Sequence, residues 1–303
     1  MKRYAILFAP AVLSHDMKDY KLLYSYNDFV RKRIGEVSLL TGIPVKILLK
    51  DQENNTDFSH FQIIKFCLFA GMLGIAEHIC SLEKASPVIS GGISLGDLNA
   101  VCLSQAIGFE DSINILKLRE EAEGDTEAVA LTYVDIDEDY EYFTRFEDMG
   151  IAVNFGTIDS GKRRMLMLSG HRRVLETIGK QGPADINIMP KEMCRAALHS
   201  GFRNHVADET NDYLQNITVN DPMFPIASAV RNIDIITKKQ TIIENIVIGE
   251  TTTLQLDQLI GQIESMNVDE IYCVGPFLRD LNINFKSNAV IEYFDKKNLI
   301  HLI

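Results

Sequence analysis

Ser94 is the residue whose surroundings point most directly to chemistry. It lies at the centre of residues 92–96, which match the pattern G-x-S-x-G, between a short apolar strand pattern and a helical one. A serine on such a sharp strand-to-helix turn exposes its Oγ as a nucleophile, and small flanking residues leave room for the turn. The N–H of Leu95 would then point at the developing oxyanion, where the helix N-terminus favours negative charge. A plain turn rich in small residues is the alternative explanation.

Five segments together resemble one known family. Residues 92–97, Gly-Ile-Ser-Leu-Gly-Asp, are similar to the G-H-S-L-G-E motif of malonyl-CoA:acyl-carrier-protein transacylases and polyketide-synthase acyltransferases. The family's other motifs follow in order: the helix that ends in an arginine (106–119), the segment with the catalytic histidine (196–200), the P-x-x-P-x-x-S strand (222–228) and the E-x-G-P turn (269–276). The resemblance therefore extends over nearly the whole chain.

The resemblance implies a role for three side chains. Ser94 would take the acyl group as an ester, with His199 as general base and then acid, because an alcohol needs an adjacent base to attack. No acid is apparent as a third member, and the family orients its histidine through backbone carbonyls. Arg119 would bind the free carboxylate of a malonyl-type acyl group, since a guanidinium fits a carboxylate bidentately. A surface arginine paired with a neighbour such as Glu123 is the alternative.

The sequence also departs from the family around the expected site. The usual G-Q-G-S-Q motif after the first strand is missing, so the second oxyanion donor would be the backbone N–H of Ala11 or Val12. Pro10 has no N–H and is excluded. Ile93 stands where the family has a polar residue, and Leu198 stands where its malonyl-specific members have phenylalanine; both would line the acyl pocket. These differences indicate either neutral substitutions that preserve side-chain volume or an altered choice of acyl unit.

Composition limits the function classes. The chain has 303 residues, 30 Lys and Arg against 42 Asp and Glu, and a formal net charge of −12. An acidic chain is a poor general binder of nucleic acid or of an anionic membrane. Its five cysteines form no C-x-x-C pair, so we expect no disulfide framework, no metal site and a reducing, cytoplasmic location.

Two apolar stretches have to be interpreted before the fold. Residues 66–76 are too few to span a bilayer and predict part of a buried helix. The N-terminal run at 4–9 follows Lys2 and Arg3 and superficially resembles a signal peptide. We interpret it instead as a short buried strand that ends at Pro10.

The remaining patterns give the elements that must position these residues. Strands at 4–9 and 87–90 alternate with helices at 20–40, 61–82, 98–106 and 111–121, and further strands follow at 226–228 and 271–274. This order predicts an α/β fold with a parallel sheet. Between them, strands at 128–134, 151–155, 165–168 and 186–189 with helices at 140–149 and 171–182 give a ferredoxin-like order. We expect an α/β-hydrolase-like catalytic domain (1–125 and 199–303) with a nucleophile elbow, and an inserted ferredoxin-like subdomain (126–198).

The resemblance implies the reaction and the partners. The expected protein is a monomeric, free-standing transacylase that carries malonyl from coenzyme A to an acyl carrier protein in polyketide biosynthesis, with the coenzyme A thioester as substrate and no bound cofactor. Carrier proteins are acidic, so a basic face is expected on the small domain at Arg163, Arg164, Arg172 and Arg173, although an ordinary solvated charge run is the alternative. An acyl hydrolase of the same fold and a non-catalytic docking subunit are the rival functions.

Overall fold

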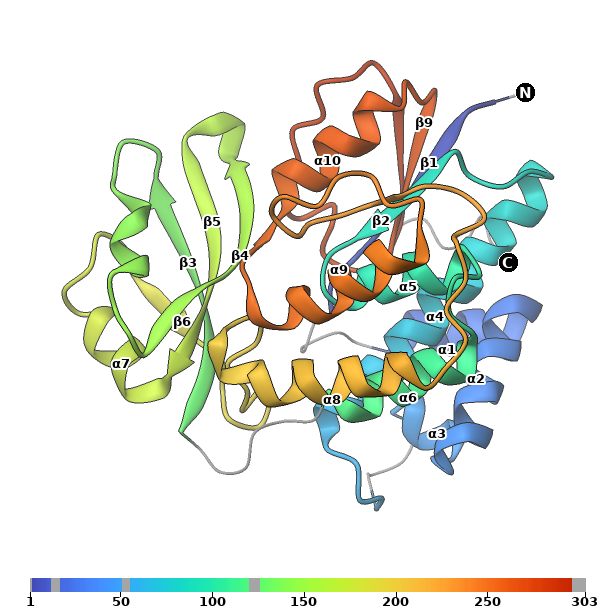
Figure 1. The fold of residues 1–303 in the computed structure, drawn as a ribbon, viewed down its shortest axis with the longest axis horizontal. Helices are drawn as coiled ribbons and strands as arrows, with labels where there is room; N and C mark the ends of the chain where they lie inside the picture. The colour runs from blue at the N-terminus through green and yellow to red at the C-terminus, as the bar shows by residue number, and fades with distance from the viewer. Residues whose placement is uncertain (1, 12–16, 51–54, 120–125, 296–303) are drawn as a thin grey trace.

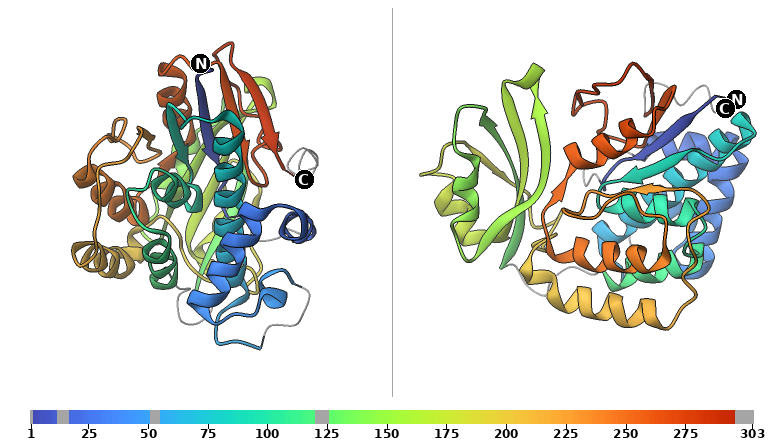
Figure 2. Two further views of the ribbon diagram at one scale, coloured as in Figure 1. Left: turned by 90° about the vertical axis from the view of Figure 1, so that its right-hand side faces the viewer. Right: turned by 45° about the horizontal axis from the view of Figure 1, so that its top comes forward.

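The chain folds around two five-stranded sheets. The computed structural model describes residues 2–11, 17–50, 55–119 and 126–295. The large sheet is surrounded by helices, and the small sheet lies to one side of this larger unit in Figure 1 and in the right-hand view of Figure 2. The prediction of an α/β fold with a parallel sheet is confirmed.

The large sheet is parallel throughout. Its strands lie in the order β10 (Val290–Phe294), β9 (Glu270–Val274), β1 (Tyr4–Phe8), β2 (Ile89–Gly92) and β7 (Ile226–Ala227). All five residues of β1 are buried, because helices cover both faces and a central parallel strand is apolar on each side. The interpretation of the N-terminal run as a buried strand is therefore confirmed.

Nine described α-helices belong to the larger unit. They are α1 (Lys18–Tyr26), α2 (Asp28–Thr41), α3 (Val45–Leu48), α4 (His60–Glu83), α5 (Leu95–Leu103), α6 (Phe109–Leu118), α8 (Asn204–Gln215), α9 (Lys239–Thr251) and α10 (Leu256–Ser265). The single helix predicted over 20–40 is wrong in one respect, because Asn27 interrupts it. The Asn27 side chain accepts hydrogen bonds from the N–H groups of Phe29 and Val30 and so begins a new helix.

Helix α4 runs through the centre of the larger unit. It begins with a capping box between Ser59 and Gln62, and most of its side chains are buried. By length and composition it could cross a membrane, but 83% of its most apolar window is buried inside the protein. The prediction of a buried core helix is confirmed.

The small sheet is antiparallel apart from one edge strand. Its order is β6 (Ile186–Ile188), β3 (Glu127–Asp135), β5 (Arg163–His171), β4 (Met149–Ile158) and β8 (Leu254–Gln255), with α7 (Arg172–Ile178) packed against it. The helix predicted at 140–149 is wrong. Only a short 3₁₀ turn, η1 (Tyr140–Thr144), forms after the Asp139 cap, and Met149 already belongs to β4.

Strand β8 connects the two units. It follows α9 of the larger unit after a short break, yet it pairs in parallel with Val153 and Asn154 of β4. The segment predicted to belong wholly to the large domain therefore contributes the outer strand of the small sheet.

Candidate active site

Ser94 occupies a strained turn between β2 and α5. Its backbone has φ 57° and ψ −110°, a combination that side-chain-bearing residues rarely adopt. The turn is possible because two glycines meet in it. A Cβ added to Gly92 would lie 2.3 Å from the carbonyl carbon of Gly96, and one added to Gly96 would lie 2.5 Å from the oxygen of Phe8. Any larger residue would force the strand, the turn and the helix apart.

The turn leaves a backbone donor beside the serine. Leu95 is the first residue of α5, so its N–H has no carbonyl partner within the helix, and the helix dipole places partial positive charge there. Ala11 lines the same cavity as Ser94 and Leu95. Val12, the other residue considered for a second donor, lies outside the described residues.

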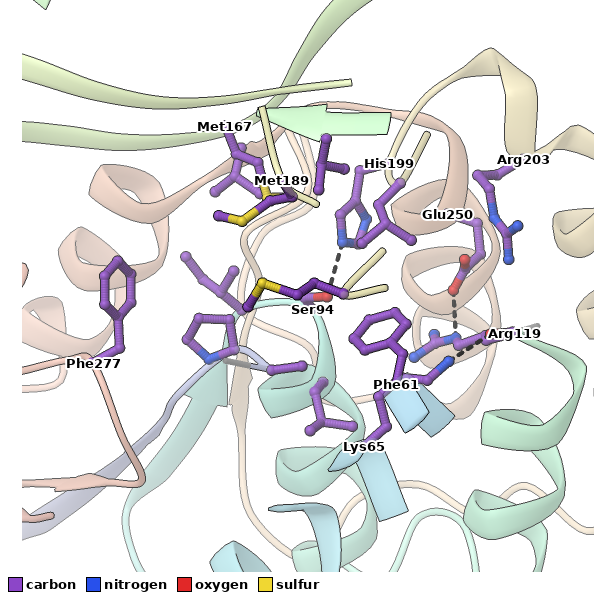
Figure 3. Close-up of a pocket in the computed structure, with 18 of the residues that line it drawn as sticks. Phe61, Lys65, Ser94, Arg119, Met167, Met189, His199, Arg203, Glu250 and Phe277 are labelled. Carbon is purple, nitrogen blue, oxygen red and sulfur yellow. Dashed lines mark hydrogen bonds and ion pairs between the residues drawn. The ribbon is translucent and has the colours of Figure 1, made fainter. Parts of the chain in front are cut away.

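His199 connects Ser94 to the end of α9. Its Nε2 lies 2.9 Å from Ser94 Oγ, and its Nδ1 lies 2.6 Å from the carbonyl oxygen of Gly249 (Figure 3). A carbonyl can only accept, so Nδ1 carries the proton and Nε2 is left to accept from the serine hydroxyl. Gly249 is among the last four residues of its helix, whose carbonyls lack intrahelical partners. The helix end thus fixes the tautomer that a general base requires.

The protonation state of His199 suits the same role. Burial lowers its pKa below the usual 6.5, and the Arg119 and Arg203 guanidinium groups lower it further. The Glu250 carboxylate and the Gly249 carbonyl act in the opposite direction. Because burial is the largest effect, the imidazole is neutral at physiological pH and able to take a proton.

Arg119 also reaches this cavity. It caps the end of α6, and its Nε lies 2.5 Å from Oε1 of Glu250. Only 15% of the Arg119 side chain and 7% of the Glu250 side chain are exposed, so the pair is shielded from water. The surface-arginine alternative is wrong, since the partner in the described structure is Glu250 in the cavity wall. Glu123 lies outside the described residues.

Two further basic side chains, which the sequence did not single out, line the cavity. Lys65 on α4 donates from Nζ to the backbone oxygen of Arg119 at 2.6 Å and lies over the ring of Phe61 at 4.7 Å. Arg203 is 1% exposed, and its pKa is lowered by burial. The sequence signal that could have identified Lys65 is its position as the single lysine in the apolar run at 61–76, because lysine is almost never fully buried unless it is paired.

The cavity itself is mostly apolar. Its volume is 250 Å³, and Ile93 and Leu198 both line it. Three methionines contribute flexible walls, and Phe277 covers one side (Figure 3). The methionines are Met167, Met189 and Met193. The lining residues come from the small sheet and from the larger unit, so the cavity lies between the two.

Behind the elbow, a polar network ties α5 to α9. Asn245 donates to both carboxylate oxygens of Asp97 at 3.0 and 2.9 Å, and Ser228 Oγ donates to the Asn245 side-chain oxygen at 2.5 Å. Burial raises the pKa of Asp97 to about 6, although Arg119 and the Asn245 bond oppose that rise. The network explains why serine ends the P-x-x-P-x-x-S strand.

The four arginines expected to form one basic face lie in two places. Arg163 and Arg164 begin β5, whereas Arg172 and Arg173 follow its last residue. At about 3.3 Å per residue these pairs are about 30 Å apart along the strand. Arg163 pairs with Asp159, and Arg172 donates to the backbone oxygen of the cavity residue Met189. The two pairs are therefore separated along the strand, and a docking role for the four arginines stays a prediction.

All five cysteines lie in the described part of the chain, and none of them forms a disulfide there. Among the described residues, no group of three or more His, Cys, Asp or Glu side chains is arranged to hold a metal ion.

Comparison with known proteins shows what the whole chain is similar to. No protein-family profile matches the sequence. The chain is 20% identical over 308 residues to the malonyl CoA-acyl carrier protein transacylase of Buchnera aphidicola subsp. Schizaphis graminum, which covers 99% of this chain and 96% of that relative.

Solved structures give the same result. The malonyl-CoA:acyl carrier protein transacylase of Helicobacter pylori matches with a TM-score of 0.81 at 19% identity, over 99% of this chain and 97% of that one. A malonyl-transacylase in complex with a type II polyketide-synthase acyl-carrier protein matches with a TM-score of 0.79 at 17% identity, over 99% of each chain. The fold is that of an acyltransferase. More narrowly, it is the fold of the malonyl-CoA:acyl-carrier-protein transacylases, and the resemblance noted in the sequence is confirmed.

Proposed function

We propose that this protein transfers a malonyl group from coenzyme A to the phosphopantetheine thiol of an acyl carrier protein, through an ester on Ser94, in polyketide biosynthesis. The observation that carries the proposal is the relay from Ser94 through His199 to the Gly249 carbonyl, in the same cavity as Arg119.

In the first half-reaction, His199 Nε2 takes the proton of Ser94 Oγ as the oxygen attacks the thioester carbonyl. The imidazolium that forms is stabilised by the Gly249 carbonyl and by the negative end of the α9 dipole. The C–S bond then breaks, the imidazolium protonates the coenzyme A thiolate, and malonyl remains on Ser94. This is nucleophilic catalysis by an alcohol with an adjacent base.

In the second half-reaction the carrier's thiol replaces coenzyme A. His199 takes the thiol proton, the thiolate attacks the ester, and the C–O bond breaks with return of the proton to Ser94. The N–H groups of Leu95 and Ala11 would hold the oxyanion in both halves. Removing one such donor typically costs about 2.7–4 kcal/mol of transition-state stabilisation.

Two observations favour the rival acyl hydrolase. Glu250 occupies the Nε of Arg119, and the cavity walls are apolar, which suits an uncharged acyl chain. Malonyl transfer is preferred because the guanidinium still faces the cavity, where basic side chains outnumber the single carboxylate among the described lining residues. The assembled Ser94–His199 pair disfavours a non-catalytic docking subunit.

The carrier protein would dock beside the small sheet. Arg172 and Arg173 line a shallow surface groove with His171, and Arg172 touches the cavity wall, so this pair is the better candidate. Arg163 and Arg164 stay as a secondary site. We further propose a cytoplasmic monomer that needs no bound cofactor and binds neither nucleic acid nor membrane, in keeping with the acidic charge and with five described cysteines that form no disulfide.

The finer fold assignment is part of the proposal. The strand order β6-β3-β5-β4 supports a ferredoxin-like insertion at 126–198, and the elbow after β2 supports an α/β-hydrolase-like domain at 1–125 and 199–303.

Intact-mass analysis after mixing with malonyl-CoA tests the reaction. The wild-type protein should gain one malonyl group, and Ser94→Ala none. Addition of a holo carrier protein should move that group to the carrier. Rapid release of free acid from uncharged acyl carriers, without malonyl loading, would establish the hydrolase instead.

A further inference from the structure

The acyl cavity is lined by several charged side chains besides Arg119. Lys65, Arg119 and Arg203 contribute positive charge, and Glu250 is the one carboxylate among the described lining residues. These residues come from four separate segments, so they meet through the tertiary fold and not because they are neighbours in the sequence.

Arg119 is not an isolated guanidinium. Glu250 lies 2.5 Å from its Nε, at the helix end that also orients His199. An acyl carboxylate approaching Arg119 meets the attraction of the guanidinium together with the repulsion of Glu250 at a similar distance. The two effects largely cancel, because Coulomb energies of opposite sign at similar distance have similar magnitude.

Lys65 supplies a positive charge that no such partner cancels. Within the described residues no carboxylate lies at ion-pair distance from its Nζ, and the side chain is 6% exposed. One of its three N–H groups donates to the Arg119 backbone oxygen, which holds the amine beside that arginine (Figure 3). An ammonium has three donors, so others are available to a ligand in the cavity.

The groups around Lys65 explain its protonation. Burial, Arg203 and Arg119 lower its pKa, while Cys194 and Glu250 raise it, with a result of about 8. The amine is therefore charged at neutral pH and loses its charge just above it. A buried charge of this kind costs stability, and such a cost is typical of functional sites.

We propose that Lys65 is a second carboxylate-binding residue of the acyl site, and that Glu250 weakens the contribution of Arg119. The preference for a carboxylated acyl group then depends on Lys65 as well as on Arg119. This inference rests on the proposed function, since it concerns the acyl group that Ser94 receives.

The test compares kcat/KM for malonyl and acetyl loading of Ser94 from the two coenzyme A thioesters. Lys65→Met should lower the malonyl-to-acetyl ratio about tenfold or more, the loss expected for a charge-assisted hydrogen bond. Glu250→Gln should raise the ratio. Lys117→Met is the matched control, because Lys117 also donates to a backbone oxygen, that of Leu40, but does not line the cavity.

The pH profile of the wild-type protein gives a second readout without any variant. Titration of His199 affects malonyl and acetyl loading equally, so it cancels in the malonyl-to-acetyl ratio of kcat/KM. The ratio should fall as pH rises through about 8, where the free enzyme loses the Lys65 charge. That decline should be absent in Lys65→Met.

The outcomes separate this inference from the proposed function. Loading of both acyl groups, with a ratio that Lys65→Met leaves unchanged and that stays flat through pH 8, would overturn the role of Lys65 alone. Failure of the wild-type protein to load either group would overturn the proposed function and the inference together.

Discussion

Replacing Gly96 with alanine tests the geometry of the elbow. The added methyl carbon would lie 2.5 Å from the oxygen of Phe8 and 2.8 Å from that of Ala9, whereas real Cβ atoms essentially never approach below 3.0 Å. Both oxygens are backbone atoms at the end of buried β1, which cannot move without disturbing the centre of the sheet. Overpacking of this kind costs about 1–3 kcal/mol of the free energy of unfolding.

The same substitution should slow the reaction more than it weakens the fold. Gly96 follows Leu95, so relief of the clash shifts α5 and its first N–H away from Ser94. Loss of that donor would cost about 2.7–4 kcal/mol, or about a hundred- to thousandfold in the rate of acylation.

Urea denaturation and quenched-flow mass analysis of malonyl loading measure the two effects. Gly261→Ala is the control, because Gly261 lies in α10 with no atom within 4 Å of an added Cβ. It should gain about 0.5–1 kcal/mol of stability at unchanged rate. If Gly96→Ala matched the wild-type protein in both stability and loading rate, the close packing of elbow and strand would be refuted.

Three further predictions concern charge. Because burial holds the pKa of His199 below 6.5, the rate of Ser94 acylation should fall on the acid side with a midpoint below pH 6.5. Glu250→Gln removes a charge that raises this pKa, so it should move the midpoint lower still. A wild-type midpoint at or above pH 6.5 would contradict this. Burial lowers the pKa of Lys65 from 10.5 to about 8, so its charge costs the folded state up to about 3 kcal/mol below pH 8. Lys65→Met should therefore be more stable in urea at pH 7, with the difference vanishing as pH rises from 8 to 10.5; equal stability at pH 7 would count against the burial of a charged amine. Arg173→Glu should slow transfer to the carrier protein severalfold but leave loading from malonyl-CoA unchanged, and added salt should slow wild-type transfer. A transfer rate that changes with neither the substitution nor the salt would contradict docking at Arg173.

The sequence predicted the nucleophile turn well because that signal is local. The spacing of Gly92, Ser94 and Gly96 is read within five residues, and the strained backbone requires those residue types. His199 required the family resemblance, since nothing in its own neighbours indicates a partner 105 positions away. The Gly249 carbonyl that orients it is a backbone atom, which leaves no trace in residue types.

The missed features depend on distant pairing. Glu250 approaches Arg119 only because α6 and α9 end at the same cavity. The two residues of β8 carry no strand pattern of their own and form a strand because β4 presents a free edge. Likewise, Arg163 and Arg164 were expected to share one basic face with Arg172 and Arg173, although the extended strand β5 separates the two pairs.

The position of β8 has a mechanical consequence. The chain passes from Gly249, which holds the imidazole of His199, to Leu254 at the border of the small sheet within five residues, and Thr253 donates to the backbone oxygen of Ile151 at 2.5 Å. A displacement of the small sheet would therefore also displace the Gly249 carbonyl, because only a short segment joins them. The position of the small sheet and the alignment of the His199 imidazole are thereby linked through a few peptide units.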